Sequence, residues 1–559
     1  MISANRSLRV VFLTGRDSRA VRLALEAVCQ CSGVTAVAVL IDTHRDTLRQ
    51  RWRNLRRNLR REGWAYALGR CVRALRDYSD RLADRCGPSL PETLDLLRQA
   101  FPHRCQTLED IARAHGFEVR EAGNLNGPEA VRLLEHYGAD LGIVLGTRIL
   151  KPSTFRVPRL GSINLHKGKV PEYRGLPPGF WELYEGAQTA GVTVHFVDSG
   201  LDTGDVVETS EVPIRRLETP ESLAEQLDRE GARALARAVE KVAAGTAVPQ
   251  KQPRADARTR TKPTRAQVAE LHARLPHWPR AQSDIAVLAK NILCLAIFRS
   301  GAYDLIRGRR KKARAAILLY HRVNDFSRDV LTIGTESFAA HLLAIRSRYA
   351  VMSTSALVEC ICARKALSAT SVLIHFDDAY RDVYTDAFAI LEAAGVSATG
   401  FVSSGFVDTG RAFQHDLDRF PFQYENCRRE DLKKWTDAGF EVGAHTVNHV
   451  NLGQCELEQA RFEIVESGRQ LQAATGQPVS LFSFPFGRIQ DIRPEVRAFV
   501  KEAGYAALFS AHGGFADPGS DLWDIPRIGV GEGHKPLYLL LEIEGLTPAA
   551  IGRRLRRLL

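Results

Sequence analysis

Short apolar segments alternate with amphipathic segments at the beginning of the chain. The pattern predicts a strand over residues 8–14 (LRVVFLT), a helix over 20–28 (AVRLALEAV) and a second strand over 35–41 (TAVAVLI). A β-α-β opening of this kind predicts a parallel sheet with helices on its faces. The pattern resumes with two apolar strands, within residues 139–147 and 161–166.

A second alternation of strands and helices begins at Ala315. It includes an apolar strand over 371–376 (SVLIHF) and a helix over 387–395 (AFAILEAAG). We therefore expect an α/β protein with two sheets, the second of them barrel-like.

The length of 559 residues exceeds one ordinary hydrophobic core and predicts two or three domains. A long helix is expected over 219–244, with Thr219 as its N-cap. The sequence that follows is basic and contains prolines, which is typical of a linker. We expect a first domain over 1–253 with a basic helical insertion over about 44–110, a linker over 254–314 and a second domain over 315–559.

Positive charge concentrates in two segments of a chain whose formal net charge is +12. In residues 44–76, arginines accompany apolar residues at helical spacing, which predicts a basic amphipathic helix on Leu48, Trp52, Leu55 and Leu59. In 284–314, an apolar run is followed by RGRRKKAR. Such a run is often a solvated face; the alternatives are contact with an anionic membrane surface or a lipid-linked substrate, and contact with a nucleic acid. No segment resembles a nucleic-acid-binding motif, so no specific nucleic acid is expected.

Composition is that of a soluble globular protein, with 45% hydrophobic and 25% charged residues. The apolar run before Gly15 is too short for a signal-peptide core, and no apolar stretch reaches the roughly 18 residues of a membrane span. The cysteine pairs Cys29/Cys31 and Cys360/Cys362 are expected to be reduced thiols. We expect a cytoplasmic protein, with peripheral contact to a membrane as an alternative.

A first candidate reaction centre lies at the end of the strand 161–166. Asn164 and His166 are two residues apart, so on a strand their side chains point to the same side. Asp202 follows between glycines in the segment GVTVHFVDSGLDTGDVV, residues 191–207. An amide donor, an imidazole and a carboxylate are the groups that acyl transfer needs to stabilise an oxyanion and to move a proton.

The wider string, NLH at 164–166, PEYRGLPPGFWELYEG at 171–186 and the segment 191–207, resembles the 10-formyltetrahydrofolate-dependent formyltransferases. The resemblance covers about residues 8–250 without the insertion, and implies a Rossmann-like domain. It implies that an amine attacks the formyl carbon, that Asn164 and protonated His166 stabilise the oxyanion, and that Asp202 orients His166. It also places the folate beside residues 143–150, on Leu145, Gly146, Thr147 and Ile149.

Two departures from that family concern the substrate. Lys167 and Gly168 stand where the family often has Pro-Ser. The tRNA-formylating members continue with a basic β domain, and this chain has no such sequence after residue 250. We therefore expect an amine-bearing sugar as the formyl acceptor, rather than a tRNA.

A second candidate centre lies in the C-terminal half. Asp377 and Asp378 follow the strand 371–376, and His445 and His449 lie four residues apart after another predicted strand. Two imidazoles and one carboxylate with an open position form the usual hydrolytic metal site, and a second carboxylate can act as base on the bound water.

This half resembles the polysaccharide deacetylases through LLYHRV at 318–323, FDDAYRDVYTDAF at 376–388, HTVNH at 445–449 and FSFPFGR at 482–488. The resemblance implies a distorted (β/α) barrel, with Asp377 as general base and Asp378, His445 and His449 as metal ligands. Zinc is the default metal, and nitrogen and oxygen ligands also accept cobalt, nickel or iron. Ala379 stands where the family usually has glycine. The family's general acid has no secure match; the candidates are His512 as the acid, with Asp524 and Arg527 as supporting residues.

Two such centres on one chain suggest an exchange of acyl groups. Removal of an N-acetyl group would expose the amine that the first centre formylates, so that an acetamido sugar becomes a formamido sugar. Three alternatives remain: independent reactions on a sugar nucleotide and a glycan, a deacetylase with an inactive formyltransferase-like binding module, and a membrane-surface scaffold.

Overall fold

The computed structural model describes residues 7–44, 64–104, 106–252, 259–278, 283–310, 312–327, 329–419, 423–547 and 550, with single positions between 49 and 59. The predicted arginine-rich helix therefore lies partly outside the described residues, and Leu48 is among those outside.

The chain forms two compact units, and each is built from two separate segments. Unit 1 comprises Met1–Glu62 and Cys105–Ala281, and unit 2 comprises Gly63–Arg104 and Gln282–Leu559. Helices α3 (Trp64–Asp84) and α4 (Leu90–Ala100) come from the predicted insertion, yet they pack against α11, α13 and α15 of unit 2.

Unit 1 contains a seven-stranded sheet in the order β3-β2-β1-β4-β5-β6-β7. Strands β1 to β5 pair in parallel, and β6 and β7 are antiparallel additions at the edge. The order 3-2-1-4-5 is that of a Rossmann-like sheet and confirms the predicted fold class of this half. The strands are β1 (Leu8–Thr14), β2 (Val34–Ile41), β3 (Glu118–Glu121), β4 (Leu141–Leu145), β5 (Ser162–His166), β6 (Thr189–Phe196) and β7 (Val206–Pro213).

Helices cover both faces of this sheet because its strands are apolar on both sides. On β1, Val10 and Phe12 join the core under α1 and α9, whereas Val11 and Leu13 join the core under α6 and α7. Thr219 caps α9 as predicted, since its side chain accepts a hydrogen bond from the Ser222 amide. The helices are α1 (Arg19–Cys29), α5 (Leu108–His115), α6 (Pro128–Tyr137), α7 (Pro152–Phe155), α8 (Phe180–Glu185), α9 (Pro220–Ala243) and α10 (Arg265–Arg274).

Unit 2 contains a parallel sheet in the order β17-β16-β15-β14-β13-β12-β8-β18, with β11 paired to β12. The two edge strands β17 and β18 are separated only by Arg527, so the sheet curls into the predicted distorted barrel. The strands are β8 (Ala315–Tyr320), β11 (Ala350–Val351), β12 (Ser371–Phe376), β13 (Thr399–Val402), β14 (Glu441–Ala444), β15 (Leu481–Ser483), β16 (Ala507–Ser510), β17 (Ile525–Pro526) and β18 (Ile528–Gly529). A separate parallel pair joins β9 (Arg322–Val323) and β10 (Thr332–Ile333).

Alternate residues of these strands pack into two cores. Leu318 and Ile374 join the core that also holds residues of α13 and α15, whereas Ile317 and Leu373 join the core inside the barrel with Phe401. The helices are α11 (Asp284–Arg299), α12 (Ala302–Arg309), α13 (Thr335–Arg346), α14 (Thr354–Cys362), α15 (Phe388–Ala394), α16 (Gln414–Leu417), α17 (Arg429–Asp437), α18 (Leu457–Thr475), α19 (Pro494–Glu502) and α20 (Pro536–Ile543), with a π-helix at Val383–Ala387 and 3-10 turns at Ser404–Phe406 and Ile489–Asp491.

Among the helices that the structure describes, none alone has the length and apolar composition of a membrane span. The pair α11 and α12 meets that test only when the two are joined, and the pair is bent by 59°.

Candidate functional site

The first site lies at the carboxyl end of β5 in unit 1. Asn164 and His166 are on this strand, and Asp202 is in the loop between β6 and β7 with a φ of 54°, which is rare for a residue other than glycine. The amide nitrogen of Asn164 is 3.5 Å from Oδ1 of Asp202, and Nδ1 of His166 is 3.4 Å from Oδ2. The structure thus brings together the three residues that the sequence proposed.

His195 is a fourth polar residue of this site, and the sequence reasoning did not select it. It lies opposite Asn164 across the antiparallel pair β5–β6, with its Nε2 3.2 Å from Nδ2 of Asn164 and 3.6 Å from Oδ1 of Asp202. Its Nδ1 donates to the carbonyl of Phe196 at 2.8 Å. A polar residue in the apolar strand GVTVHFV was the available signal, but only the strand register places it beside Asn164.

Burial and hydrogen bonding set the protonation of this site. The Nε2 of His166 donates to the carbonyl of Tyr173 at 2.8 Å, which leaves Nδ1 facing Asp202. Burial lowers the pKa of His166, although Asp202 acts in the opposite direction. Burial also opposes ionisation of Asp202, but His195 and His166 outweigh it and lower the pKa of this carboxyl. The resting site therefore holds a neutral imidazole beside a carboxylate, so the protonated His166 expected from the resemblance arises after proton uptake.

The residues proposed for folate lie at the end of β4 and just after it, and β4 runs beside β5 with Val144 opposite Asn164. Leu145 is buried, Gly146 turns the chain with a φ of 63°, and Ile149 is 70% exposed. The hydroxyl of Thr147 donates to the carbonyl of Arg148. The segment thus lies at the sheet edge that carries Asn164, and its role in binding stays a prediction.

The departure at Lys167 and Gly168 has a local structural reason. Lys167 forms an ion pair with Asp228 on α9. A Cβ on Gly168 would lie 2.3 Å from the carbonyl oxygen of Tyr173 and 2.7 Å from Nε2 of His166. A side chain at 168 would therefore disturb the hydrogen bond that orients His166.

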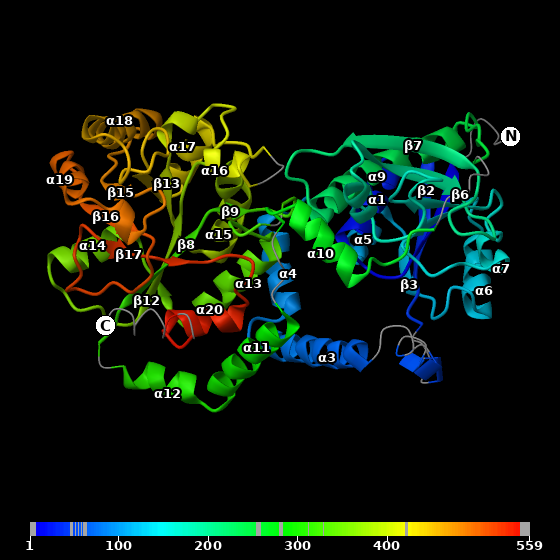
Figure 1. The fold of residues 1–559 in the computed structure, drawn as a ribbon, viewed down its shortest axis with the longest axis horizontal. Coiled ribbons are helices and arrows are strands. Elements are labelled where there is room, and N and C mark those ends of the chain that lie inside the picture. Colours follow the sequence, from blue (N-terminus) through cyan, green and yellow to red (C-terminus); the bar gives the residue numbers. More distant parts are fainter. Residues whose placement is uncertain are drawn as a thin grey trace. The chain divides into compact units, whose positions relative to one another are not determined.

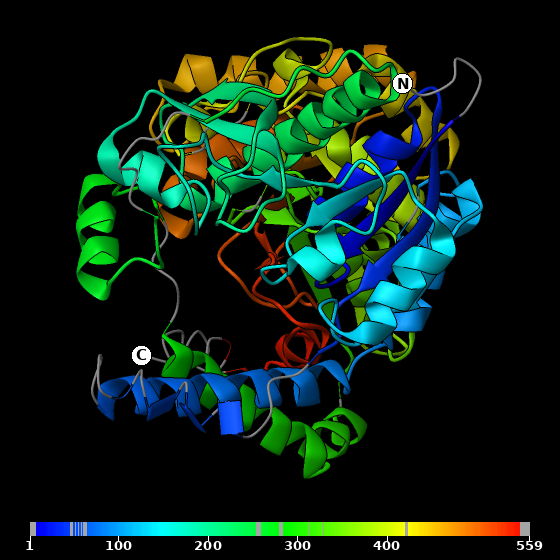
Figure 2. The same cartoon turned by 90° about the vertical axis from the view of Figure 1, so that its right-hand side faces the viewer.

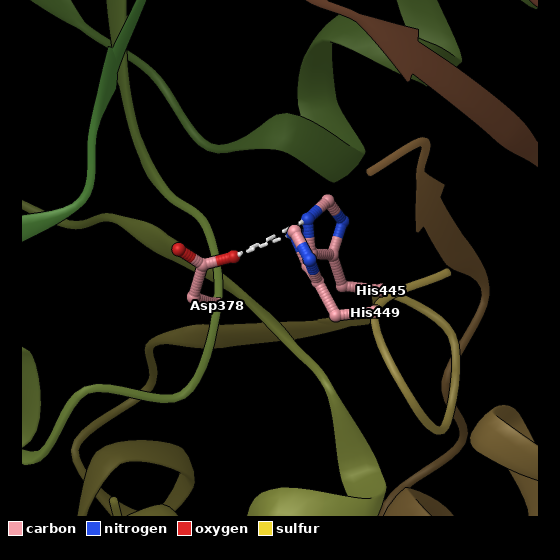
Figure 3. Close-up of side chains that lie close together, drawn as sticks. All are labelled: Asp378, His445 and His449. Carbon is pink, nitrogen blue, oxygen red and sulfur yellow. Dashed lines mark ion pairs between the residues drawn. The ribbon is translucent and has the colours of Figure 1, made fainter. Parts of the chain in front are cut away.

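The second site lies at the carboxyl ends of β12 and β14 in unit 2. Figure 3 shows Asp378, His445 and His449 pointing toward one another. Oδ1 of Asp378 is 3.0 Å from Nε2 of His449 and 3.7 Å from Nε2 of His445. Asp378 and His449 have φ values of 76° and 54°, and such strained backbone is typical of functional sites.

The donor atoms of this group fit a divalent metal ion. Asp378 is buried, and neither of its carboxylate oxygens accepts a hydrogen bond from the residues that the structure describes. Nδ1 of His445 donates to the carbonyl of Ser483 at 2.8 Å, which leaves Nε2 free as an electron-pair donor. Burial lowers the pKa of His445 to about 4, so this ring is neutral at pH 7. One carboxylate and two imidazoles whose donor atoms lie within 4.8 Å of one another can hold a metal ion.

Arg527 holds Asp377, the proposed general base. Its Nη1 and Nη2 donate to Oδ1 and Oδ2 of Asp377 at 2.6 and 2.7 Å, and Nη2 also donates to the hydroxyl of Ser483. Burial would raise the pKa of Asp377, but the Arg527 guanidinium lowers it, so the carboxylate stays ionised. Arg527 was proposed only as a supporting residue, and the structure defines its contact.

Two further imidazoles adjoin this group, and the sequence reasoning gave neither a role. His321 directly follows β8, where Asp378 and Asp377 oppose the lowering of its pKa by burial. Nε2 of His415 is 3.9 Å from Oδ2 of Asp378 and 2.9 Å from the hydroxyl of Tyr380. His321 directly follows a strand, as Asp377 does, so its position in the sequence could have identified it. His415 lies on the short helix α16 and has no comparable signal.

His512, the earlier candidate for general acid, pairs instead with Asp524, with its Nε2 2.9 Å from Oδ1. Neither residue contributes an atom to the described group of Asp378, His445 and His449. Its role as acid stays a prediction, and His321 becomes a second candidate.

Comparison with family models places one domain in each half of the chain. Residues 102–239 match the formyl transferase family, and residues 364–508 match the polysaccharide deacetylase family. The chain thus carries a formyl transferase domain and a polysaccharide deacetylase domain, which confirms both resemblances.

Curated relatives match the first domain. Methionyl-tRNA formyltransferase of Synechococcus sp. (strain JA-3-3Ab) is 37% identical over 149 residues, which are 26% of this chain and 46% of the relative. The enzyme of the same name from Lachnospira eligens is 36% identical over 146 residues, again 26% of this chain and 46% of the relative. The chain spans just under half the length of these relatives.

Among solved structures, Streptococcus pyogenes deacetylase PplD in complex with acetate is 21% identical, covering 42% of this chain and 99% of that one, with a TM-score of 0.37. Glycinamide ribonucleotide transformylase 1 from Symbiobacterium toebii is 18% identical, covering 45% of this chain and 98% of that one, with a TM-score of 0.30.

Proposed function

We propose that this chain is a bifunctional enzyme that removes the N-acetyl group of an amino sugar and formylates the exposed amine with 10-formyltetrahydrofolate. The observation that carries the proposal is that each domain contains its own convergent set of acyl-transfer or hydrolytic groups. These are Asn164, His166 and Asp202 in unit 1, and Asp377, Asp378, His445 and His449 in unit 2.

In the deacetylase site, Asp378, His445 and His449 would hold the metal. A bound divalent metal, zinc by default, supplies a water whose pKa falls to about 7 and polarises the amide carbonyl. Asp377, kept ionised by Arg527, would accept the proton of the attacking water. A general acid donates a proton to the leaving amine as the C–N bond breaks, and His512 and His321 are the candidates for this role.

In the formyltransferase site, the neutral amine attacks the formyl carbon. The Asn164 amide donates to the developing oxyanion, and Nδ1 of His166 takes the amine proton. Asp202 then stabilises the imidazolium that forms. The imidazolium returns this proton to the folate nitrogen as the bond between the formyl carbon and that nitrogen breaks, which leaves a formamide and tetrahydrofolate.

An exchange of acetyl for formyl explains why both activities share one chain. If the hydrolase instead removed the formyl group, the two reactions would consume formyl donor and give no net product. The acceptor is proposed to be an amino sugar, free, nucleotide-linked or within a glycan. The curated relatives named for methionyl-tRNA match over only 46% of their length, so their tRNA substrate is not carried over.

Mass spectrometry of N-acetylhexosamines incubated with the full chain and zinc tests the proposal. Without folate, we expect replacement of acetyl by hydrogen. With 10-formyltetrahydrofolate, we expect a net loss of one methylene unit. Asp377→Asn should abolish both products, whereas Asp202→Asn should abolish only formylation, and Asp437→Asn on the surface of α17 is the matched control.

Deacetylation that folate does not alter, together with formylation of a different supplied amine, would replace the exchange by two independent reactions. Deacetylation without any formyl transfer or folate binding would mean that unit 1 is a binding module.

A further inference from the structure

Helices α3 and α11 of unit 2 pack against each other through polar contacts. Nη1 of Arg76 pairs with Asp284 at 2.5 Å, and the buried amide of Asn291 donates to Ser79 and Asp80 at 3.0 and 2.9 Å. These two helices are the blue and green ones that lie side by side at the lower edge of Figure 1, and Figure 2 shows them from the side. These polar contacts lie beside the buried apolar residues Ala83 of α3 and Cys294 and Leu295 of α11.

The outer face of α11 is apolar along its length. The exposed residues on it follow the spacing i, i+4, i+7 and i+11, which is one stripe of a helix: Ile285, Ala289, Ile292 and Ala296, with Ala286 and Leu293 beside them. Ile285, Ile292 and Leu293 are 67%, 56% and 45% exposed. The stripe contains no polar side chain until Arg299 at its end.

Helix α3 carries a second exposed apolar stripe. It runs at the same helical spacing through Trp64, Leu68, Cys71, Leu75 and Tyr78. Helical periodicity places Arg81 and Arg85 along one border of this stripe, whereas Arg70 and Asp77 lie next to each other farther round the helix and Asp84 lies on the opposite side. An apolar stripe bordered by arginines is the pattern of a helix that lies in a membrane interface.

Helix α12 extends the apolar face from the C-terminal end of α11. Leu305 and Ile306 are 51% and 39% exposed, while Tyr303 is buried and hydrogen-bonds to Tyr349. Three basic side chains are exposed on α12 or just after it: Arg307, Arg309 and Lys312. Asp304 is the exposed acidic residue of this helix.

We propose that α3, α11 and α12 form a docking surface, here called the α3–α11–α12 face, that binds unit 2 to an anionic membrane. The exposed aliphatic and aromatic side chains enter the acyl boundary, and the bordering arginines and Lys312 contact acidic headgroups. Its polar inner contacts and the 59° bend suit a helix layer that lies on the bilayer.

Charge favours a membrane over a second copy of the chain or a nucleic acid as the partner of the α3–α11–α12 face. A second copy of the chain would bring the same arginines against one another, and a nucleic acid would not need two apolar stripes. An anionic bilayer satisfies the apolar stripes and the arginines together.

Flotation of the full chain with liposomes tests the proposal. We expect binding to vesicles that contain phosphatidylglycerol, weaker binding to pure phosphatidylcholine, and release as sodium chloride rises. Ile292→Ser/Leu293→Ser on α11, Leu68→Ser/Leu75→Ser on α3 and Arg309→Gln/Lys312→Gln should each lower the partition constant about tenfold. Brominated lipid should quench Trp64 fluorescence, and Trp64→Phe should remove that signal.

Matched controls on the same unit are Phe462→Ser/Val465→Ser on α18, which removes equally exposed apolar side chains, and Lys433→Gln/Lys434→Gln on α17. Thermal unfolding of each variant checks that it is folded. The proposal is overturned if the full chain does not float with anionic vesicles, or if the controls weaken binding as much as the test variants. Self-association that the α11 variant abolishes, without vesicle binding, would assign the face to a second copy instead.

Discussion

Arg527 forms a buried ion pair with Asp377, and that pair is the most sensitive contact of the deacetylase site. Arg527→Met removes the guanidinium and leaves a buried carboxylate unpaired, which costs about 3 kcal/mol of unfolding free energy. The pKa of Asp377 then rises because burial is no longer offset, and the base is protonated at neutral pH. We expect deacetylation to fall by about 100-fold, a typical contribution of general-base catalysis, with recovery of rate as pH is raised.

Deacetylation assays across pH, with urea unfolding of the same variant, measure both effects. Arg527→Lys keeps a positive charge but loses the bidentate geometry. Its deacetylation rate should lie between those of the parent chain and the Arg527→Met variant. A Met variant with an unshifted pH profile would argue against Asp377 as the base.

Gly168 tests the formyltransferase site at the same scale. Gly168→Ala would place a methyl group 2.3 Å from the Tyr173 carbonyl, so that carbonyl must move away from His166. We expect formyl transfer to fall about tenfold or more, because His166 loses the partner that sets its tautomer. Deacetylation by the same preparation serves as the internal control, since the substitution lies in the other unit. Unchanged formyl transfer would show that the Tyr173 contact does not orient His166.

At the scale of elements, α9 begins with a side-chain cap. The capping box formed by Thr219 and Ser222 satisfies the first amides of this long helix, whose buried face covers the sheet of unit 1. Thr219→Ala should lower the unfolding free energy of unit 1 by about 1 kcal/mol. Urea unfolding followed by circular dichroism measures it. Thr246→Ala, just beyond the end of α9, is the control and should change stability by less.

Helices α3 and α4 show how an element can belong to a domain distant in sequence. Leu96 and Leu97 of α4 join the core of unit 2, where α4 contacts α13 and α15. The sequence pattern predicts a helical insertion over about 44–110. It has no local feature that assigns the helices of this insertion to one core, because that assignment depends on contacts with residues more than two hundred positions away.

For the whole molecule, metal binding should act on one unit only. Zinc held by Asp378, His445 and His449 stabilises unit 2 by about 2.7 kcal/mol when free metal is 100-fold above its dissociation constant. Calorimetry with and without a chelator should therefore move the unfolding of the deacetylase domain and leave that of the formyl transferase domain in place. His449→Gln should remove the metal effect. A chelator that shifts both transitions equally would contradict a single site in unit 2.

Acid stability of the molecule follows from buried neutral histidines. Burial lowers the pKa of His341 to about 4, below its value of about 6.5 in an unfolded chain. The unfolded state therefore binds more protons between these values, so the unfolding free energy falls as pH drops from 6.5 toward 4. The contribution of His341 is about 3 kcal/mol over that window. Urea unfolding at pH 7 and pH 5 measures it, and His341→Gln should give a smaller drop than the parent chain. An equal drop would assign the acid sensitivity to other groups.

The sequence alone determined the elements and the two chemistries of this protein. Period-two apolar runs predict strands, and the residues directly after parallel strands must meet at one edge of a sheet. Strand-end position singled out Asn164, His166 and Asp378, and a spacing of four singled out His445 and His449. The resemblances to two families then implied the roles of these residues.

Only the tertiary structure decided the partners that come from distant segments. His195 reaches Asn164 through the register of an antiparallel pair, and Arg527 reaches Asp377 because the two edges of the barrel meet at that residue. The contacts between α3 and α11 also depend on the tertiary structure, and they leave one apolar stripe of each helix exposed. The physical reason is that periodicity reports which side of an element is apolar, whereas register and closure depend on the joint packing of all elements.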